Sequence, residues 1–369
     1  MGCASSTVEP TGISVETHKF VNASKAGTLA NSARVKTRTK GDDVITESRQ
    51  LGAVFFGLNV PFSEIDVRST LGAGNFGVVY EAYCKGKRVA VKKIYLRDTS
   101  EKSTDLVDFS QEVDILSVLI HPNIVHFLGA VQEHPNYCLI TELCEGSVLD
   151  LLKLVESKKA VATWGLTLDI ANDCAAACHY LHSLNPIILH RDIKAENLLI
   201  TELFRCKLSD FGLSRSLEKD AIANTICGTP RWVAPEIYRG DVYSEKIDIY
   251  SYGIVLWELF CFKKPYLDQD PINLPYMVVH RNLRPPLCSH IPEVLHNLMR
   301  ACWHPDPSQR PSFGQIRTLL DDARKQVVLS LSIDTTITYD EAVEQYKRKH
   351  FGGNNNGYRV GFGVKSGLL

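Results

Sequence analysis

A chain of 369 residues with 44% hydrophobic and 22% charged residues has the composition of an ordinary globular protein. These values exclude wholesale disorder, a collagen-like repeat and a short disulfide scaffold, and the length suits one two-lobed unit or two small domains. Lys and Arg number 41 against 42 for Asp and Glu, a formal net charge of −1, so no overall field favours nucleic acid and none is expected as a partner.

The first 57 residues are rich in Ser, Thr, Ala, Asn and Lys, which predicts a disordered arm. The pattern M-G-x-x-x-[ST] at the start predicts N-myristoylation of Gly2. One acyl chain binds a bilayer only marginally, but Cys3 offers a palmitoylation site, and residues 17–40 hold six Lys and Arg with no Asp or Glu. We therefore expect a peripheral protein on the acidic cytoplasmic face of a membrane, with the plasma membrane as the first candidate. The alternative is an arm in which Gly2 is incidental.

The apolar runs are far shorter than the roughly 18 to 20 residues of a transmembrane helix, and the start lacks the apolar core of a secretory signal. A reducing compartment is therefore expected. The 11 cysteines include no C-x-x-C pair, so we interpret them as thiols, buried mainly as small hydrophobic side chains.

Residues 58–325 combine short β-type runs with long helical patterns and are interpreted as the folded body. Its first part, residues 58–143, contains four runs that predict strands: Ser63–Leu71, Val78–Cys84, Arg88–Ile94 and Tyr137–Thr141. Apolar spacing between the last two runs predicts one helix, Leu106–Leu119, on a small antiparallel sheet. Residues 146–325 are mostly helical, including Thr167–His182 and Ile247–Phe260. Residues 326–369 form a largely flexible tail with a short helical segment near 340–350.

Gly72, Gly74 and Gly77 form a G-x-G-x-x-G-x-V pattern between the first two predicted strands. Glycines there let backbone N–H groups close over a polyphosphate with no Cβ in the way. A dinucleotide-binding loop would lead into a helix, whereas Val78–Tyr80 continues as strand. Taken alone, the pattern also fits a plain Gly-rich hairpin.

Lys92 ends the strand-like run V-A-V-K, where a rigid backbone can hold a cation against phosphates. Glu112, on the predicted helix, is the candidate partner that orients it. Without the motifs that follow, two surface charges would be the ordinary interpretation.

The second half of the body carries the remaining motifs. In H-R-D-I-K-A-E-N, Asp192 is placed to accept the proton of an incoming hydroxyl, and Asn197 is a candidate Mg²⁺ ligand. Asp210, in D-F-G, supplies a second hard oxygen ligand. The triplet A-P-E follows at Ala234–Glu236.

In this order and at these separations, the motifs resemble the catalytic domain of eukaryotic protein kinases over about Phe62–Arg324, some 70% of the chain. The resemblance implies an α+β, bilobal protein kinase fold, with a small antiparallel β-sheet and one helix in the N-lobe and a larger α-helical C-lobe. It also implies ATP and Mg²⁺ as cofactors and proteins as substrates.

The resemblance carries roles over to single residues. Catalysis is assigned to Asp192 as base, Lys194 as the group that neutralises developing charge, and Lys92 oriented by Glu112. ATP binding is assigned to Leu71, Gly72, Gly74, Gly77, Val79, Ala90, Lys92, Thr141, Glu142, Cys144, Asn197, Leu199 and Asp210, with Asn197 and Asp210 as the Mg²⁺ ligands. A spine of Leu116, Phe127, His190 and Phe211 anchored by Asp248, and an ion pair of Glu236 with Arg310, would support the site.

Lys194 and Thr229 are similar to serine/threonine kinases, while the stretches around Cys144, Trp232, Trp257 and Trp303 resemble the tyrosine-kinase-like group that includes Raf-like enzymes. The resemblance predicts phosphoryl transfer to Ser and Thr, with dual specificity left open. Thr225 is the predicted activation-loop phosphosite, with Ser214 and Ser216 as alternatives and Arg191 as the phosphate-binding residue. An upstream kinase or autophosphorylation in trans would modify it.

Two other functions remain open at this stage. A pseudokinase-like scaffold would normally lack the lysine, base or metal ligand, all of which are present here. A small-molecule kinase fits poorly with Gly228–Glu236, which resembles a platform for protein substrates. A homodimer of kinase domains is a further expectation from the related groups.

Overall fold

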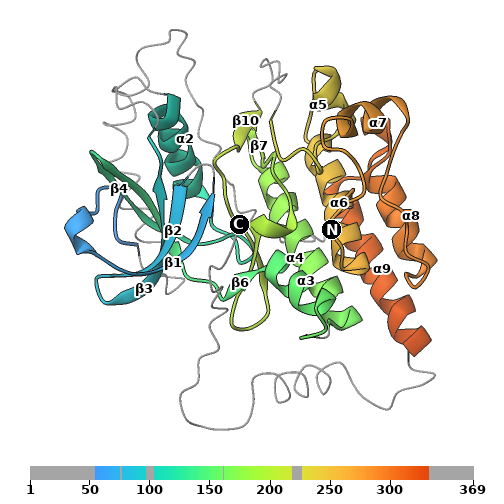
Figure 1. Cartoon of the computed structure of the whole chain (residues 1–369), viewed down its shortest axis with the longest axis horizontal. Helices are drawn as coiled ribbons and strands as arrows, with labels where there is room; N and C mark the ends of the chain where they lie inside the picture. Colours follow the sequence, from blue (N-terminus) through green and yellow to red (C-terminus); the bar gives the residue numbers. More distant parts are fainter. Residues whose placement is uncertain (1–54, 75–76, 97–103, 161, 218–226, 332–369) are drawn as a thin grey trace, which may run out of the picture. The chain divides into compact units, whose positions relative to one another are not determined.

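The computed structural model describes residues 55–74, 77–96, 104–160, 162–217 and 227–331. Five strands form an antiparallel sheet in the order β1-β2-β3-β5-β4 (Figure 1). They are β1 (Ile65–Gly74), β2 (Gly77–Cys84), β3 (Lys87–Ile94), β4 (Phe127–Glu133) and β5 (Asn136–Glu142). The register aligns Val79 with Lys92 and Ala90 with Thr141, so residues predicted for nucleotide binding lie on adjacent strands.

Helix α2 (Thr104–Val118) buries the charged residue Glu112 in the first lobe. Its buried positions include Phe109, Glu112, Val113 and Leu116, which share one face at helical spacing. The helix packs against β4, and Glu112 lies on the same covered face. A buried carboxylate is costly unless it is paired, so this position requires a cation nearby.

The folded body begins earlier than the predicted boundary at residue 58. The Phe56 N–H donates to the Leu128 carbonyl (2.6 Å), and the Phe55 ring lies 6.3 Å from that of Phe127. The 3₁₀ turn η1 (Phe62–Glu64) then leads into β1. Aromatic burial against β4 thus outweighs the polar composition of the preceding arm.

The second lobe is mostly helical (Figure 1). Its helices are α3 (Val148–Glu156), α4 (Trp164–Ser183), α5 (Pro235–Arg239), α6 (Lys246–Cys261), α7 (Leu274–His280), α8 (Glu293–Cys302) and α9 (Phe313–Leu331), with 3₁₀ turns η2 (Ala195–Asn197) and η3 (Pro307–Gln309). Every residue from Ile247 to Cys261 is buried, so α6 is the centre of this lobe. Helix α9 packs on α4 and continues six residues past the predicted end at 325.

Side-chain caps explain where two of these helices start. Ser147 and Asp150 form a reciprocal capping box at the beginning of α3, and Thr163 accepts from the Leu166 N–H at the beginning of α4. Short strands lie between the helices: β6 (Gly146–Ser147), β7 (Ile187–Leu189), β8 (Leu198–Ile200), β9 (Cys206–Leu208) and β10 (Arg215–Leu217).

The predicted fold class is confirmed, with an antiparallel sheet and one helix followed by a helical lobe. Within the described ranges, no helix combines the length and apolarity that a bilayer crossing demands. Strand β4, Phe127–Glu133, was missing from the prediction. The predicted arm (apart from residues 55–57), the tail after residue 331, Gly2, Cys3 and Thr225 lie outside the described residues.

Candidate active site

The glycine-rich turn joins β1 to β2. A Cβ at Gly77 would lie 2.1 Å from the Lys93 carbonyl oxygen, so the packing of β2 on β3 itself requires glycine there. At Gly72 and Gly74 a Cβ would meet no atom within 4 Å. Packing within the protein therefore does not require glycine at these two positions. Their exposed backbone leaves room for a ligand.

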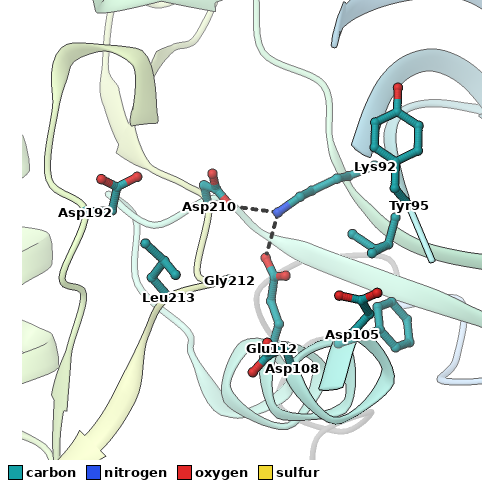
Figure 2. Close-up of a pocket in the computed structure, with 11 residues that line it drawn as sticks. Lys92, Tyr95, Asp105, Asp108, Glu112, Asp192, Asp210, Gly212 and Leu213 are labelled. Atoms are coloured by element: carbon teal, nitrogen blue, oxygen red, sulfur yellow. Dashed lines mark hydrogen bonds and ion pairs between the residues drawn. The ribbon is translucent and has the colours of Figure 1, made fainter. Parts of the chain in front are cut away.

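Lys92 lies between two carboxylates (Figure 2). Its Nζ is 2.6 Å from Asp210 Oδ1 and 3.2 Å from Glu112 Oε1. Burial opposes the charge of Lys92, but the two carboxylates outweigh it and raise the pKa of this lysine. Burial raises the pKa of Glu112 in spite of Lys92, whereas for Asp210 the attraction of Lys92 outweighs burial and lowers the pKa. The predicted pair of Lys92 and Glu112 is thus formed, and Asp210 joins it.

The loop before η2 is fixed to α6. Asp248 Oδ2 accepts from the His190 N–H (2.9 Å) and Oδ1 accepts from the Arg191 N–H (2.8 Å), while His182 Nε2 lies 2.9 Å from Oδ2. Burial acts to raise the pKa of Asp248, but His182 and the other partners lower it. A carboxylate with several donors is held in its charged form. The loop that carries Asp192 is therefore anchored to the buried centre of the lobe.

Four hydrogen bonds orient the carboxylate of Asp192. The Thr229 hydroxyl (2.6 Å) and N–H (3.0 Å) donate to Oδ1, while Lys194 Nζ (2.6 Å) and Asn197 Nδ2 (3.0 Å) donate to Oδ2. Lys194 Nζ also lies 2.7 Å from the Thr229 hydroxyl oxygen. The arrangement presents a carboxylate beside a cation in a partly covered site, which suits a general base.

Asn197 and Asp210 were predicted as Mg²⁺ ligands, and their surroundings fit that chemistry. The Asn197 amide nitrogen donates to Asp192, which leaves its oxygen as the group suited to a metal. The Ser209 N–H donates to the Asn197 carbonyl (2.9 Å), so the residue before Asp210 is attached to Asn197. Amide and carboxylate oxygens are the hard ligands that Mg²⁺ prefers. Among the described residues, no group of three His, Cys, Asp or Glu side chains is placed to hold an ion.

Two site residues have left-handed backbone conformations. Asp210 has φ 62° and Arg191 has φ 67°. Such angles are uncommon for residues with a Cβ and occur where the surroundings fix them. A Cβ at Gly212 would lie 3.3 Å from Glu112 Oε2, so a side chain there would press on the partner of Lys92.

Six of the residues predicted for ATP binding are half-buried: Val79, Ala90, Thr141, Glu142, Cys144 and Leu199. Glu142 has further partners, because its N–H donates to the His126 carbonyl (3.0 Å) and its carboxylate accepts from Lys207 (2.6 Å). These contacts brace the connection between the lobes. Leu71 is exposed on β1 at the edge of the same region.

The predicted supporting residues come together. The His190 and Phe211 rings lie 5.0 Å apart edge to face, and Leu116 and Phe127 are buried in the same core cluster. Arg310 and Glu236 form two hydrogen bonds of 2.6 and 2.8 Å, with 0% and 2% of their side chains exposed. Arg191 donates to the Leu213 carbonyl and to the Tyr243 hydroxyl, so it already contacts the segment after Asp210.

The alternative phosphosites differ in accessibility. The Ser214 side chain is fully buried, and its hydroxyl donates to the His190 carbonyl (3.3 Å), so an enzyme could not reach it in this arrangement. Ser216 is exposed on β10.

A pocket of this region extends from Lys92 past Glu112 and Asp210 to Asp192 (Figure 2). Figure 2 shows Lys92 pointing between Asp210 and Glu112, with Asp192 beyond Asp210. Sequence reasoning did not identify two contributors to the site. Thr229 was read only as a mark of the serine/threonine type, and Asp108 on α2, which lines the pocket, had no motif to single it out.

These features together define the protein kinase class: a two-lobed fold, the pair of Lys92 with Glu112, the anchored loop of Asp192, and Asp210 near Asn197. A family model for "Protein tyrosine and serine/threonine kinase" matches residues 65–320. That match covers more than half of the chain, and the chain belongs to this family.

Curated relatives agree with the family. The chain is 40% identical over 280 residues to a "Probable serine/threonine-protein kinase" of Dictyostelium discoideum. The matched region covers 76% of this chain and 30% of that protein. It is 40% identical over 267 residues to the same organism's "Probable serine/threonine-protein kinase drkD", covering 72% and 20%. The "Dual specificity protein kinase shkD" is 34% identical over 290 residues, covering 78% and 37%. The chain thus spans well under half the length of these relatives.

Proposed function

We propose that the chain is an ATP-dependent protein kinase that transfers the γ-phosphoryl group to Ser and Thr hydroxyls of proteins in signal transduction. The observation that carries this proposal is the joint geometry of Lys92 and Asp192. Lys92 is paired with Glu112 and Asp210, while Asp192 is oriented by Thr229, Lys194 and Asn197. A pseudokinase-like scaffold would need neither arrangement.

The proposed chemistry follows from these contacts. Asp192 accepts the proton of the acceptor hydroxyl, and Lys194, 2.6 Å from its carboxylate, offsets negative charge that develops on the transferred group. Lys92 holds phosphate oxygens from a strand and is kept in position by Glu112. Bound Mg²⁺ would supply charge neutralisation between phosphates, with Asn197 and Asp210 as the residues to hold it.

The hydroxyl preference rests on Thr229 and on the relatives. The Thr229 hydroxyl donates to Asp192 and accepts from Lys194. Thr229 therefore links the segment proposed to bind protein substrates to the proposed base. The relatives with 40% identity carry serine/threonine-kinase names, and one further relative is named as dual specificity. These observations favour Ser and Thr as acceptors.

The first test is transfer from labelled ATP with Mg²⁺ to a generic protein substrate, followed by phosphoamino-acid analysis. Asp192→Asn should abolish phosphoserine and phosphothreonine, while Asp268→Asn, an exposed aspartate on another segment, should retain them. Phosphotyrosine as the main product would change the specificity. Equal transfer by wild type and Asp192→Asn, or none from protein coexpressed with candidate activators, would refute the proposal.

We propose further that phosphorylation of Thr225 activates the kinase. Arg191 already bonds to the Leu213 carbonyl and Tyr243, so its guanidinium lies at the segment that leads toward Thr225. A phosphate brings nearly two negative charges and would pair with that guanidinium. Thr225→Ala should lower kcat at least tenfold after phosphorylation in trans, and Ser216→Ala should not. Full activity of Thr225→Ala would contradict this step.

The N-terminal sequence supports a membrane location, with acyl groups on Gly2 and Cys3 and a basic segment at residues 17–40. Gly2→Ala should move the protein from membranes to the soluble fraction. Cys3→Ser should weaken membrane retention without preventing myristoylation. Membrane retention by Gly2→Ala would exclude lipid anchoring at this residue.

A further inference from the structure

A small hollow opens in the helical lobe where α4 begins and α6 ends. It has a volume of about 120 Å³ and is lined by six residues: Ala162, Trp164, Thr167, Phe260, Phe262 and His290. The rings of Trp164 and Phe260 stack with 5.7 Å between their centroids. An apolar cavity of about 150 Å³ can hold a benzene ring, so a hollow of this size suits a single aromatic side chain.

Polar atoms in the walls of the hollow are engaged within the protein. The Thr167 hydroxyl donates to the carbonyls of Thr163 and Trp164 (both 3.1 Å). His290 Nε2 lies 3.0 Å from the Phe260 carbonyl oxygen, which attaches the segment before α8 to the end of α6. The hollow is therefore held open by bonded walls and favours an apolar or aromatic group.

The hollow is flanked by cations. Four exposed lysines belong to the two chain segments that line it: Lys158, Lys159, Lys263 and Lys264. The first two lie within four residues of Ala162, and the last two directly follow Phe262. Among the described residues, none of the four lysines forms an ion pair. An aromatic group that carries carboxylates beside it would complement this surface in both shape and charge.

The C-terminal segment of the chain leaves the described body beside this hollow. Helices α4 and α9 pack together in opposite directions, since a Cβ at Gly314 would lie 3.4 Å from the His179 ring and Arg324 pairs with Asp169. The end of α9 is seven residues beyond Arg324. It therefore lies level with the position seven residues before Asp169, which is Ala162 in the wall of the hollow.

The sequence that follows α9 has the chemistry that the hollow and its lysines require. Tyr339, Val343 and Tyr346 recur at the spacing of one helical face. Residues 339–346 also hold three carboxylates, those of Asp340, Glu341 and Glu344, and no Lys or Arg. Residues 332–338 join this segment to α9, and seven extended residues can span up to about 25 Å. The segment lies beyond residues 65–320, which the family model matches.

We propose that residues 339–346 dock on the hollow of the same chain. One tyrosine ring fills the space beside Trp164 and Phe262, and the three carboxylates face the four lysines. A short connection gives the segment a high effective concentration at the hollow, which favours the chain's own segment over that of a second copy. The site is thus an intramolecular interaction surface for an acidic, aromatic peptide.

The first test cross-links the full chain with a carbodiimide, which joins carboxylates to neighbouring lysines, and maps the products by mass spectrometry. We expect bonds from Asp340, Glu341 or Glu344 to the lysines around the hollow. Their yield should not change on about tenfold dilution, because the contact is intramolecular. The double variant Tyr339→Ser with Tyr346→Ser keeps every reacting group and should lose these cross-links.

The second test measures hydrogen exchange of the full chain. Amides of residues 339–346 should exchange about tenfold more slowly than in a synthetic peptide of the same sequence. Lys263→Glu with Lys264→Glu should remove this protection. Lys85→Glu with Lys87→Glu makes the same change of charge at two exposed positions of the first lobe and should keep it.

Four results would overturn the proposal. They are exchange as fast as in the free peptide, protection that survives both the tyrosine and the Lys263 and Lys264 variants, cross-links that survive the tyrosine variant, and a cross-link yield that falls on dilution. The last result would assign the contact to a second copy. If Gly2→Ala exposed residues 162–167 to exchange while the tyrosine variant did not, the occupant would be an acyl chain instead. None of these measurements depends on kinase activity.

Discussion

Thr229 lies in the segment proposed to bind protein substrates and contacts Asp192, the residue proposed as the base. Its hydroxyl donates to Asp192 and lies 2.7 Å from Lys194 Nζ, so one small side chain fixes both groups. Its N–H donates to the same carboxylate oxygen. The hydroxyl is therefore a positioning group, and its removal should affect transfer more than nucleotide binding.

Thr229→Val keeps the shape of the side chain but deletes the hydroxyl. Asp192 and Lys194 would each lose a partner, and we expect kcat to fall by about 10- to 100-fold with little change in the KM for ATP. Thr229→Ser retains the hydroxyl and should keep most of the activity. Steady-state kinetics with varied ATP and a fixed peptide substrate measure both parameters. A Thr229→Val enzyme with normal kcat would show that the hydroxyl does not position the base.

Glu258 is a buried carboxyl group on α6 whose ionisation should set an alkaline limit on stability. Burial and the nearby Glu196 carboxylate raise its pKa to about 8, although the Trp232 indole N–H donates to it at 2.7 Å. The native state therefore holds a proton that the unfolded chain, with the ordinary value of 4.5, has released. The free energy of unfolding then decreases as pH rises from about 4.5 to about 8 and levels off above that.

Glu258→Gln removes this titration and keeps an oxygen to accept from Trp232. The melting temperature of the variant relative to that of wild type should increase as the pH is raised from 5 to 8.5. At the upper end this relative gain should be several degrees. Glu293→Gln, an exposed position on α8, is the control and should follow the wild-type pH dependence more closely. Parallel curves for Glu258→Gln and wild type would show that Glu258 is already ionised in the native protein.

Helix α2 is attached to the segment after the D-F-G triplet by one ion pair. Arg215 Nη2 on β10 lies 2.7 Å from Asp108 Oδ1, one turn before Glu112. The position of Glu112 relative to Lys92 depends on where α2 lies. The ion pair between Asp108 and Arg215 is thus suited to keep the helix, and Glu112 on it, near Lys92.

Asp108→Asn should reduce kcat by a few-fold, because a partly exposed pair contributes only about 0.2–1 kcal/mol. Arg215→Gln should have a similar effect, and the double variant should lose no more than the single ones, since both delete the same contact. Arg300→Gln, which breaks an exposed pair on α8, should leave kcat unchanged. Additive losses in the double variant would show that the two residues act separately.

The elements that periodicity predicts well are those with one covered face. The predicted bounds of β2, β3 and α2 differ from the observed ones by one or two residues, and the apolar spacing in α2 matches its burial. Strand β4 was missed because Phe127–Val131 is buried at every position, and a short apolar run with a glycine has no period to read.

The pairing of Lys92 with Glu112 was predictable from motif spacing. The contacts of Asp108 with Arg215 and of Thr229 with Asp192 were not, because they join segments 107 and 37 residues apart.

One large core cluster contains residues of α2 and β4 together with most of the helical lobe. A smaller cluster fills the other side of the sheet, around Val60, Val89 and Ile140. Among the ion pairs of the described residues, Glu236 with Arg310 is the most deeply buried. Arg310 Nη1 also donates to the Lys246 carbonyl (2.9 Å), so the pair joins α5, the start of α6 and the segment before α9.

Removing one member of this pair should destabilise the whole body far more than removing both. Glu236→Gln leaves the Arg310 guanidinium buried without a counter-charge, for which a loss of about 3–5 kcal/mol in the free energy of unfolding is expected. For a body of this size, that corresponds to a fall of roughly 10 °C in melting temperature. The double variant Glu236→Leu with Arg310→Met removes both charges and fills similar volume, so it should recover at least half of the loss. Thermal and urea unfolding of wild type, Glu236→Gln and the double variant measure these differences in stability. A double variant less stable than Glu236→Gln would mean that the attraction between the two charges contributes more than their burial costs.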